Sequence, residues 1–196
     1  MVDRGQAHTL EAVVAGLLLL SSIIFALQMT AVTPLSASTS SQHIENQQQS
    51  VARGVLAAAA EQESLKPTVL YWNETVGDFH GVTGVGYYTN EPPNTTFGGM
   101  LERSFDQRGI SYNVYLSFET PAGEQKRKRM IYRGVPSDNA VVAARTVALM
   151  DDDPLYSAVS EPIAGTTLDN SSSFYMGDTG GAVYNVVRVE VVTWRI

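Results

Sequence analysis

RGQAHTLE, residues 4–11, stands directly before an uncharged apolar run that extends from Ala12 to Leu27. With the residues up to Val32 included, this run makes about 31 Å of α-helix at roughly 1.5 Å per residue. That length matches the hydrocarbon core of a bilayer, which is about 30 Å thick. Because the residues that follow are polar, charged or alternating, we expect a membrane-inserted N-terminal helix that carries a soluble head.

Composition limits what the head can be. The chain has 196 residues, and those after residue 66 suffice for one packed core. The formal net charge of −7 argues against a dedicated nucleic-acid-binding protein, because such domains are usually basic. The sequence contains no cysteine, so disulfides and thiolate metal sites are excluded.

Three kinds of N-terminal processing fit the sequence. A secretory signal peptide would be cut after Ala37, which follows Leu35 and Ser36 in an A-x-A-like site. An uncleaved signal anchor would keep the whole segment. A prepilin-type signal would be cut by a peptidase before the apolar helix, which the mature protein would then retain.

The third interpretation depends on Arg4, Gly5, Gln6 and Glu11. This order resembles the archaeal type IV pilin-like pattern, in which a basic residue and Gly precede Gln and a nearby Glu. The resemblance implies a prepilin peptidase that cuts at Gly5 or Gln6, and a Glu11 carboxylate that pairs with the N-terminal amine of a neighbouring subunit. Glu11 is the sixth residue after a cut behind Gly5, whereas the family usually has Glu at the fifth.

Glu11 also has a simpler interpretation, since a carboxylate in the first turn of a helix interacts favourably with the helix dipole.

A closer resemblance covers roughly the first 50 residues. Residues 4–12, 31–35 and 38–47 are similar to those of a group of uncharacterised haloarchaeal membrane proteins. That resemblance implies a pilin-like protein oriented toward the cell surface, and it implies no known activity.

Charge predicts the orientation. Arg4 precedes the apolar helix, and the next basic residue is Arg53. The positive-inside rule therefore places the N-terminus in the cytoplasm and the head outside the cell membrane. Three N-x-S/T sequons, at Asn73, Asn94 and Asn170, lie in the head and are candidate glycosylation sites.

Residues 35–66 are predicted to form an extracellular helical stalk. Apolar residues at Ile44, Val51 and Val55 and the Ala-rich stretch after them favour one long helix from about Thr9 to Leu65, with a seam that packs on the head. Pro34 predicts a kink near Thr30, and Pro67 is expected to end the helix. A flexible polar linker over residues 36–50 remains the alternative.

The remaining residues are predicted to form an α+β head with an antiparallel sheet of four or five strands. We expect strands over residues 68–72, 111–119, 126–133, 140–150 and 183–195, and a short helix capped by Thr95 or Thr96. The last strand is apolar on both faces, which is typical of a central strand. The predicted organisation is thus a leader (1–5), a transmembrane helix (6–34), the stalk (35–66) and the head (67–196).

Few residues of the head suggest chemistry. His80 is interpreted as a loop residue. Asp151, Asp152 and Asp153 are interpreted as a solvated acidic turn, with a Ca²⁺ site to which Asp178 contributes as the alternative. The basic run 126–129 is split between two faces by strand alternation, which indicates a charged sheet edge that resists aggregation. Contact with an acidic neighbouring subunit or surface, and DNA capture by an external filament, are further alternatives for this run.

We therefore expect a non-enzymatic, single-pass surface protein without a cofactor: a pilin-like or pseudopilin-like subunit of a type IV pilus-like or secretion system. Its partners would be the membrane, other copies or other pilin-like subunits, and a prepilin peptidase. The alternatives are a stand-alone signal-anchored binding or sensor module, and a surface hydrolase that uses scattered carboxylates.

Overall fold

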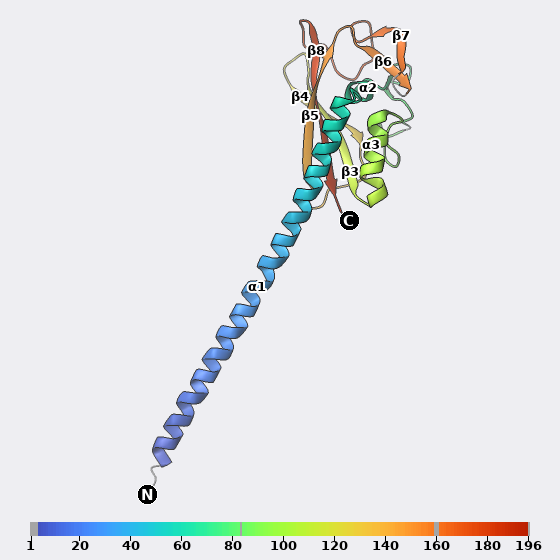
Figure 1. Ribbon diagram of the computed structural model, residues 1–196. Coiled ribbons are helices and arrows are strands. Elements are labelled where there is room, and N and C mark those ends of the chain that lie inside the picture. Colours follow the sequence, from blue (N-terminus) through green and yellow to red (C-terminus); the bar gives the residue numbers. More distant parts are fainter. Residues whose placement is uncertain (1–3, 83, 159–160, 196) are drawn as a thin grey trace. The chain divides into compact units, whose positions relative to one another are not determined.

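The computed structural model describes residues 4–82, 84–158 and 161–195, and the side chains of residues 4–7, 29–41 and 158 also lie outside the description. The chain forms two compact units, residues 1–44 and 45–196. The first unit is helical and the second combines helices with antiparallel strands (Figure 1). The predicted α+β class with an N-terminal apolar helix and an antiparallel sheet is therefore confirmed.

One helix, α1 (Arg4–Glu61), contributes residues to both units. Its backbone is helical across residues 36–50, where a flexible linker was the alternative. The kink predicted near Thr30 falls among residues whose side chains are not described, so it stays a prediction.

The end of α1 differs from the prediction. The helix stops at Glu61, and Glu63 adopts a positive φ of 51°, which turns the chain. Pro67 does not end α1, because it lies within a second short helix, α2 (Leu65–Val69). Proline is tolerated there because the first turn of a helix needs no backbone N–H donor.

The prediction of a strand over residues 68–72 is also wrong. Thr68 and Val69 belong to α2, and the Thr68 hydroxyl donates to the carbonyl of Ser64 at 2.9 Å. Both side chains are buried, and the Thr68 hydroxyl also lies 2.8 Å from that of Thr95, so tertiary contacts override the β preference of the two residues. Only Trp72 and Asn73 are extended: they form β1 (Trp72–Asn73), which pairs with β2 (Asp78–Phe79).

The main sheet of the second unit has four strands in the order β4-β3-β8-β5, all antiparallel to their neighbours. Their bounds are β3 (Ser111–Glu119), β4 (Gln125–Ile131), β5 (Val141–Met150) and β8 (Val183–Trp194). The predicted central position of the last strand is confirmed, since β8 lies between β3 and β5. A hairpin of β6 (Pro154–Ala158) and β7 (Glu161–Thr167) was not predicted.

A third helix, α3 (Thr96–Ser104), begins as expected. The Thr95 hydroxyl accepts a hydrogen bond from the N–H of Gly98 at 3.1 Å, which is N-cap geometry. A side chain at Gly98 would meet the Pro93 carbonyl oxygen at 1.9 Å, so this position requires glycine. A 3₁₀ turn, η1 (Asp106–Arg108), follows, and Gly109 ends it with a left-handed φ of 63°.

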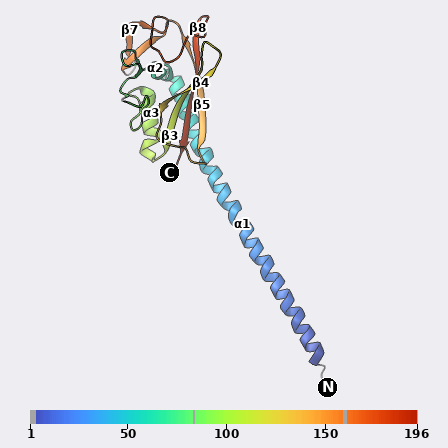
Figure 2. The same cartoon turned by 180° about the vertical axis from the view of Figure 1, so that it is seen from behind.

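The core lies on one face of the main sheet, under the last turns of α1 and under α3 (Figures 1 and 2). Val187, Val189 and Val191 of β8 are buried on this face. The buried stripe of α1 is Gln48, Ala52, Leu56 and Ala59 rather than the predicted seam through Val51 and Val55, which are half-buried. Because alanine side chains are small, they let the helix approach the sheet closely. The positions that are fully buried against the sheet are therefore alanines rather than the larger valines.

The opposite face of β8 is covered only in part. Near its C-terminal end, Val192 and Trp194 are buried with Tyr115 and pack against Tyr132 and Ala140. Near its start, Val186 is 52% exposed. Both faces of the strand are therefore buried over residues 191–194, whereas its earlier part leaves Val186 and Arg188 exposed.

The two faces of β8 provide a matched pair of substitutions. Val187→Ala removes two methyl groups from a fully buried side chain and is expected to lower the free energy of unfolding by about 2–3 kcal/mol. Val186→Ala, next to it on the open face, should change it by less than about 0.5 kcal/mol. Tryptophan fluorescence during urea unfolding of the detergent-solubilised chain measures both, because Trp72 and Trp194 are buried. Equal effects would contradict this assignment of the faces.

Candidate functional site

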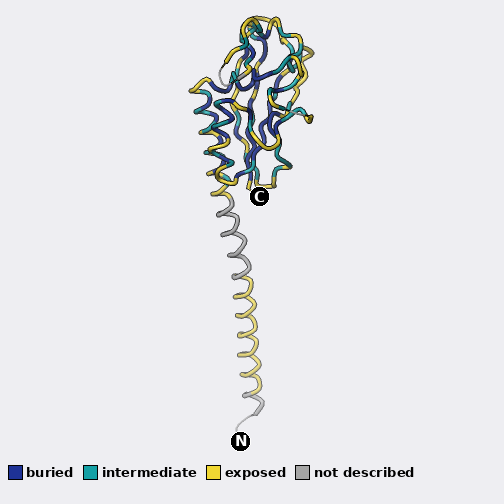
Figure 3. Tube along the Cα trace, turned by 90° about the vertical axis from the view of Figure 1, so that its right-hand side faces the viewer, coloured by how far each residue is buried: buried dark blue, intermediate teal, exposed yellow. Residues whose placement is uncertain are grey.

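The apolar segment of the first unit is exposed on every side. Among the described residues, one helix is long and apolar enough to cross a membrane, and it spans His8–Gln28. Every residue of this span is exposed within the chain itself (Figure 3). The large apolar side chains concerned are Leu10, Val13, Val14, Leu17, Leu18, Leu19, Leu20, Ile23, Ile24, Phe25 and Leu27. This arrangement is compatible with membrane anchoring.

Glu11 lies at the start of this span. Its carboxylate is 82% exposed and lies 3.7 Å from Nδ1 of His8, one helical turn earlier. This contact is an ion pair only when the imidazole is protonated. Gly5 and Gln6 lie in the first turn of α1, and their side chains are outside the description.

The three sequon asparagines differ in how they are bonded. Asn94 is exposed, directly before the cap of α3. The Asn73 side-chain oxygen accepts from the N–H groups of Thr75 and Val76, at 3.0 and 3.3 Å. The exposed Asn170 also bonds the backbone, at Thr167 N–H and Gly165 C=O. Glycosylation of these sites stays a prediction.

The acidic turn does not present a common set of metal ligands. Asp153 binds Lys66 at 2.8 Å and accepts from the N–H of Met150. Partial burial, together with the charges of Asp178, Asp169 and Asp152, raises the pKa of Asp151. Among the described residues, no group of three or more acidic or histidine side chains is arranged to hold a metal ion.

The basic run is split between two faces of β4, as predicted. Lys128 points to the core side, where its ammonium group lies 5.2 Å from the Trp72 ring and 3.8 Å from Asp78. Arg127 lies on the opposite face, stacked 3.6 Å over the Tyr115 ring and paired with Glu190 at 2.9 Å. Since β4 is an edge strand, these charges also protect the sheet from edge-to-edge pairing.

His80 lies in a turn, as expected. Its ring is 4.9 Å from the Tyr71 ring, and burial lowers its pKa, with backbone hydrogen bonds at Trp72 and Tyr156 acting in the opposite direction. The hydroxyl of Tyr88 donates to the His80 carbonyl. These contacts give His80 a role in packing.

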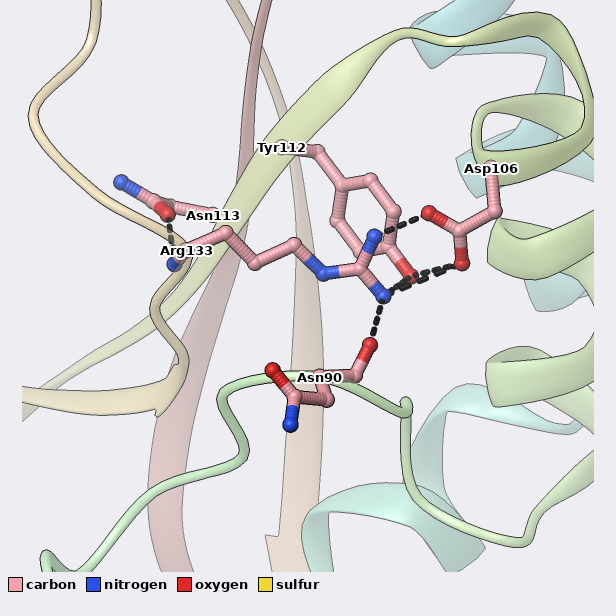
Figure 4. A network of polar contacts seen from close by, with 5 residues as sticks. All are labelled: Asn90, Asp106, Tyr112, Asn113 and Arg133. Atoms are coloured by element: carbon pink, nitrogen blue, oxygen red, sulfur yellow. Dashed lines mark hydrogen bonds and ion pairs between the residues drawn. The ribbon is translucent and has the colours of Figure 1, made fainter.

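A polar network around Arg133 was not predicted (Figure 4). The guanidinium group binds both carboxylate oxygens of Asp106, and it donates to the Tyr112 hydroxyl at 3.0 Å and to the Asn90 carbonyl at 2.7 Å. It also stacks 4.1 Å from the centroid of the Tyr112 ring. Burial raises the pKa of Tyr112 well above its usual value, an effect that the Arg133 charge opposes and the Asp106 charge increases.

The network joins segments that are far apart in the sequence. Asp106 comes from η1, Tyr112 from β3, and Arg133 follows β4, whose end is held where the Arg133 N–H donates to Asn113 at 2.7 Å. No local spacing in the sequence brings these residues together, so the network could not be read from a motif. Its geometry indicates a structural role.

These features define an α+β protein whose N-terminal apolar helix is compatible with membrane anchoring. The chain belongs to a family of unknown function, DUF7288, whose model matches residues 4–193. No curated protein and no solved structure matches it significantly.

The network predicts an asymmetric response to substitution. Asp106→Ala leaves the Arg133 charge half-buried without its carboxylate and is expected to lower the free energy of unfolding by roughly 2–3 kcal/mol. Adding Arg133→Met to the same chain should recover part of this loss, because the unpaired charge is removed. Asp138→Ala, at an exposed position, serves as control. Urea unfolding measures all three, and an Asp106→Ala effect as small as the control would contradict the account.

Proposed function

We propose that this chain is a non-enzymatic, membrane-anchored surface protein, a pilin-like or pseudopilin-like subunit of a type IV pilus-like or secretion system. The observation that carries the proposal is the fully exposed apolar span His8–Gln28, with the Glu11 carboxylate near its start. The N-terminus would lie in the cytoplasm and the head outside the cell.

The exposed span requires an apolar environment. Covering one Leu, Ile or Phe side chain is worth about 1.5–3 kcal/mol, and the span presents many of them. Nothing in the described part of the chain covers them, so a bilayer or the equivalent helices of other subunits must do so. A helix that is apolar on all sides is compatible with both environments. A subunit that moves from the membrane into an assembly needs this property.

Glu11 supports the assembly part of the proposal. A carboxylate at the edge of the bilayer is costly unless it has a partner. The nearest basic side chain that the structure describes is His8, whose Nδ1 lies 3.7 Å from the Glu11 carboxylate and pairs with it as an ion only when protonated. Cleavage at Gly5 or Gln6 would create a new N-terminal amine, and this amine on a neighbouring subunit is the partner that the pilin-like pattern implies.

The polar groups of the head are consistent with a structural subunit. Asp153 is paired with Lys66, Arg127 with Glu190, and Arg133 with Asp106. These side chains stabilise the fold, which supports a structural role over the surface hydrolase considered from the sequence. The exposed Asn94 fits an extracellular head that carries glycans.

The mature N-terminus tests the proposal. We expect the membrane-bound protein from its native host to begin at Gln6 or Ala7, as read by N-terminal sequencing. Copies that carry Leu18→Cys should also form disulfide dimers in the membrane. Each dimer reports contact at this position, because the sequence has no other cysteine. An intact Met1, or a cut near Ala37, would contradict the pilin-like assignment.

Glu11→Gln provides a control for the second step. It should leave the cleavage site unchanged and reduce Leu18→Cys dimers, because the amide cannot pair with an amine as an ion. Glu61→Gln, exposed at the end of α1, should affect neither. A cleaved chain that never forms dimers would instead support the stand-alone binding or sensor module.

A further inference from the structure

A groove of about 460 Å³ lies between α1 and the edge strand β5. Three arginines line it: Arg53 of α1, Arg145 of β5 and Arg188 of β8. The rest of the lining is aliphatic and includes Leu56 and Val142. We call this surface the arginine groove.

The positive charge of the arginine groove is largely unneutralised. Arg53 and Arg145 are exposed, and no ion pair joins either to a carboxylate within the residues that the structure describes. Arg188 is 56% exposed and shares its one carboxylate, Glu190, with Arg127. Arg53 and Arg145 are thus two cationic side chains of the groove without a paired carboxylate among the described residues, whereas Arg188 is paired with Glu190 and lies on the same face of β8 as Val186.

The strand beside the groove is also open to a partner. β5 is an edge strand, and α1 satisfies one of its carbonyl groups, that of Val142, through the side-chain amide of Gln49 at 3.3 Å. The opposite edge, β4, carries Arg127 and Arg129. Pairing β5 of one copy with β4 of another would therefore bring like charges together, which is unfavourable.

An acidic surface lies near the end of β5. Asp151 and Asp152 follow this strand directly, and the backbone N–H of Asp169 donates to the carbonyl of Asp151 at 2.9 Å, which places Asp169 beside them. The charge of Asp178 also acts on Asp151 and helps to raise its pKa. Asp153 is neutralised by Lys66, whereas none of the other four has an ion-pair partner among the described side chains. We call Asp151, Asp152, Asp169 and Asp178 the acidic cluster.

We propose that the arginine groove of one copy binds the acidic cluster of a second copy. The observation in favour of this occupant is charge complementarity: among the described side chains, Arg53 and Arg145 of the groove and the four aspartates of the cluster have no ion-pair partner, and each surface offers the charges that the other lacks. The inference deepens the proposed function and rests on it, because it names the head surface through which assembled copies meet.

The geometry makes the contact heterologous. Arg145 and Asp151 are separated by about 20 Å along the strand direction, at roughly 3.3 Å per residue. Two copies joined in this way use different surfaces, and each keeps one groove and one cluster free. Such contacts extend into rings or open filaments rather than closed dimers.

Charge reversal tests the contact in the full-length chain, reconstituted in phosphatidylcholine vesicles. Copies labelled with donor or acceptor dye at Val135→Cys, 82% exposed, report association by energy transfer. The groove-reversed variant Arg53→Glu/Arg145→Glu should associate about tenfold more weakly than the parent. The cluster-reversed variant Asp151→Lys/Asp152→Lys should do the same, and a mixture of the two should recover association, because the reversed surfaces again match.

The control is Arg103→Glu/Arg108→Glu, which makes the same charge change at exposed positions of α3 and η1. Association of this variant should equal that of the parent. A control that falls as far as the groove-reversed variant, or a mixture that shows no recovery, would overturn the inference. Unchanged association of the groove-reversed variant, with loss only of polyaspartate binding, would assign the groove to an external polyanion and overturn it as well.

Disulfide formation at Leu18→Cys in the same vesicles separates the two proposals. If the Leu18→Cys helices crosslink and groove reversal leaves the energy transfer unchanged, the proposed groove contact is wrong and the proposed subunit role is retained. If energy transfer depends on the groove while helices never crosslink and Met1 is retained, the heads associate without pilin-like assembly.

Discussion

The apolar span His8–Gln28 imposes the main constraint on this protein, because its side chains have no cover within the described chain. Burial of apolar surface is the dominant favourable term in folding and association. In the proposed function, a helix that is apolar on all sides obtains this term from a bilayer or from other helices. The proposed anchor and the proposed subunit contacts both follow from this requirement.

The second unit meets the same requirement internally. The last turns of α1 bury Ala52, Leu56 and Ala59 against the sheet, and β8 places Val187, Val189 and Val191 beneath them. One helix thus contributes a segment that the fold covers and a segment that it leaves exposed. The charged surfaces of the head, the arginine groove and the acidic cluster, are proposed to add ionic contacts to the apolar contacts of the span.

Elements with a strong local signal were predicted from the sequence. The apolar run, the Thr95 cap and the two-sided strand β8 each carry their information within a few residues. Predictions failed where tertiary contacts decide. Thr68 is helical because of its bond to Ser64 and its packing, and the Arg133 network joins three elements that no spacing links. The acidic turn was recognised, but its pairing with Lys66 was visible only in the fold.

The most direct test of the membrane-anchored account is cysteine accessibility in intact cells, since the sequence has no native cysteine. A membrane-impermeant maleimide is applied to cells that express Glu124→Cys, exposed between β3 and β4, or Leu18→Cys, within the apolar span. The account predicts labelling of Glu124→Cys before lysis and protection of Leu18→Cys. Labelling of Leu18→Cys in intact cells, or labelling of Glu124→Cys only after lysis, would contradict it.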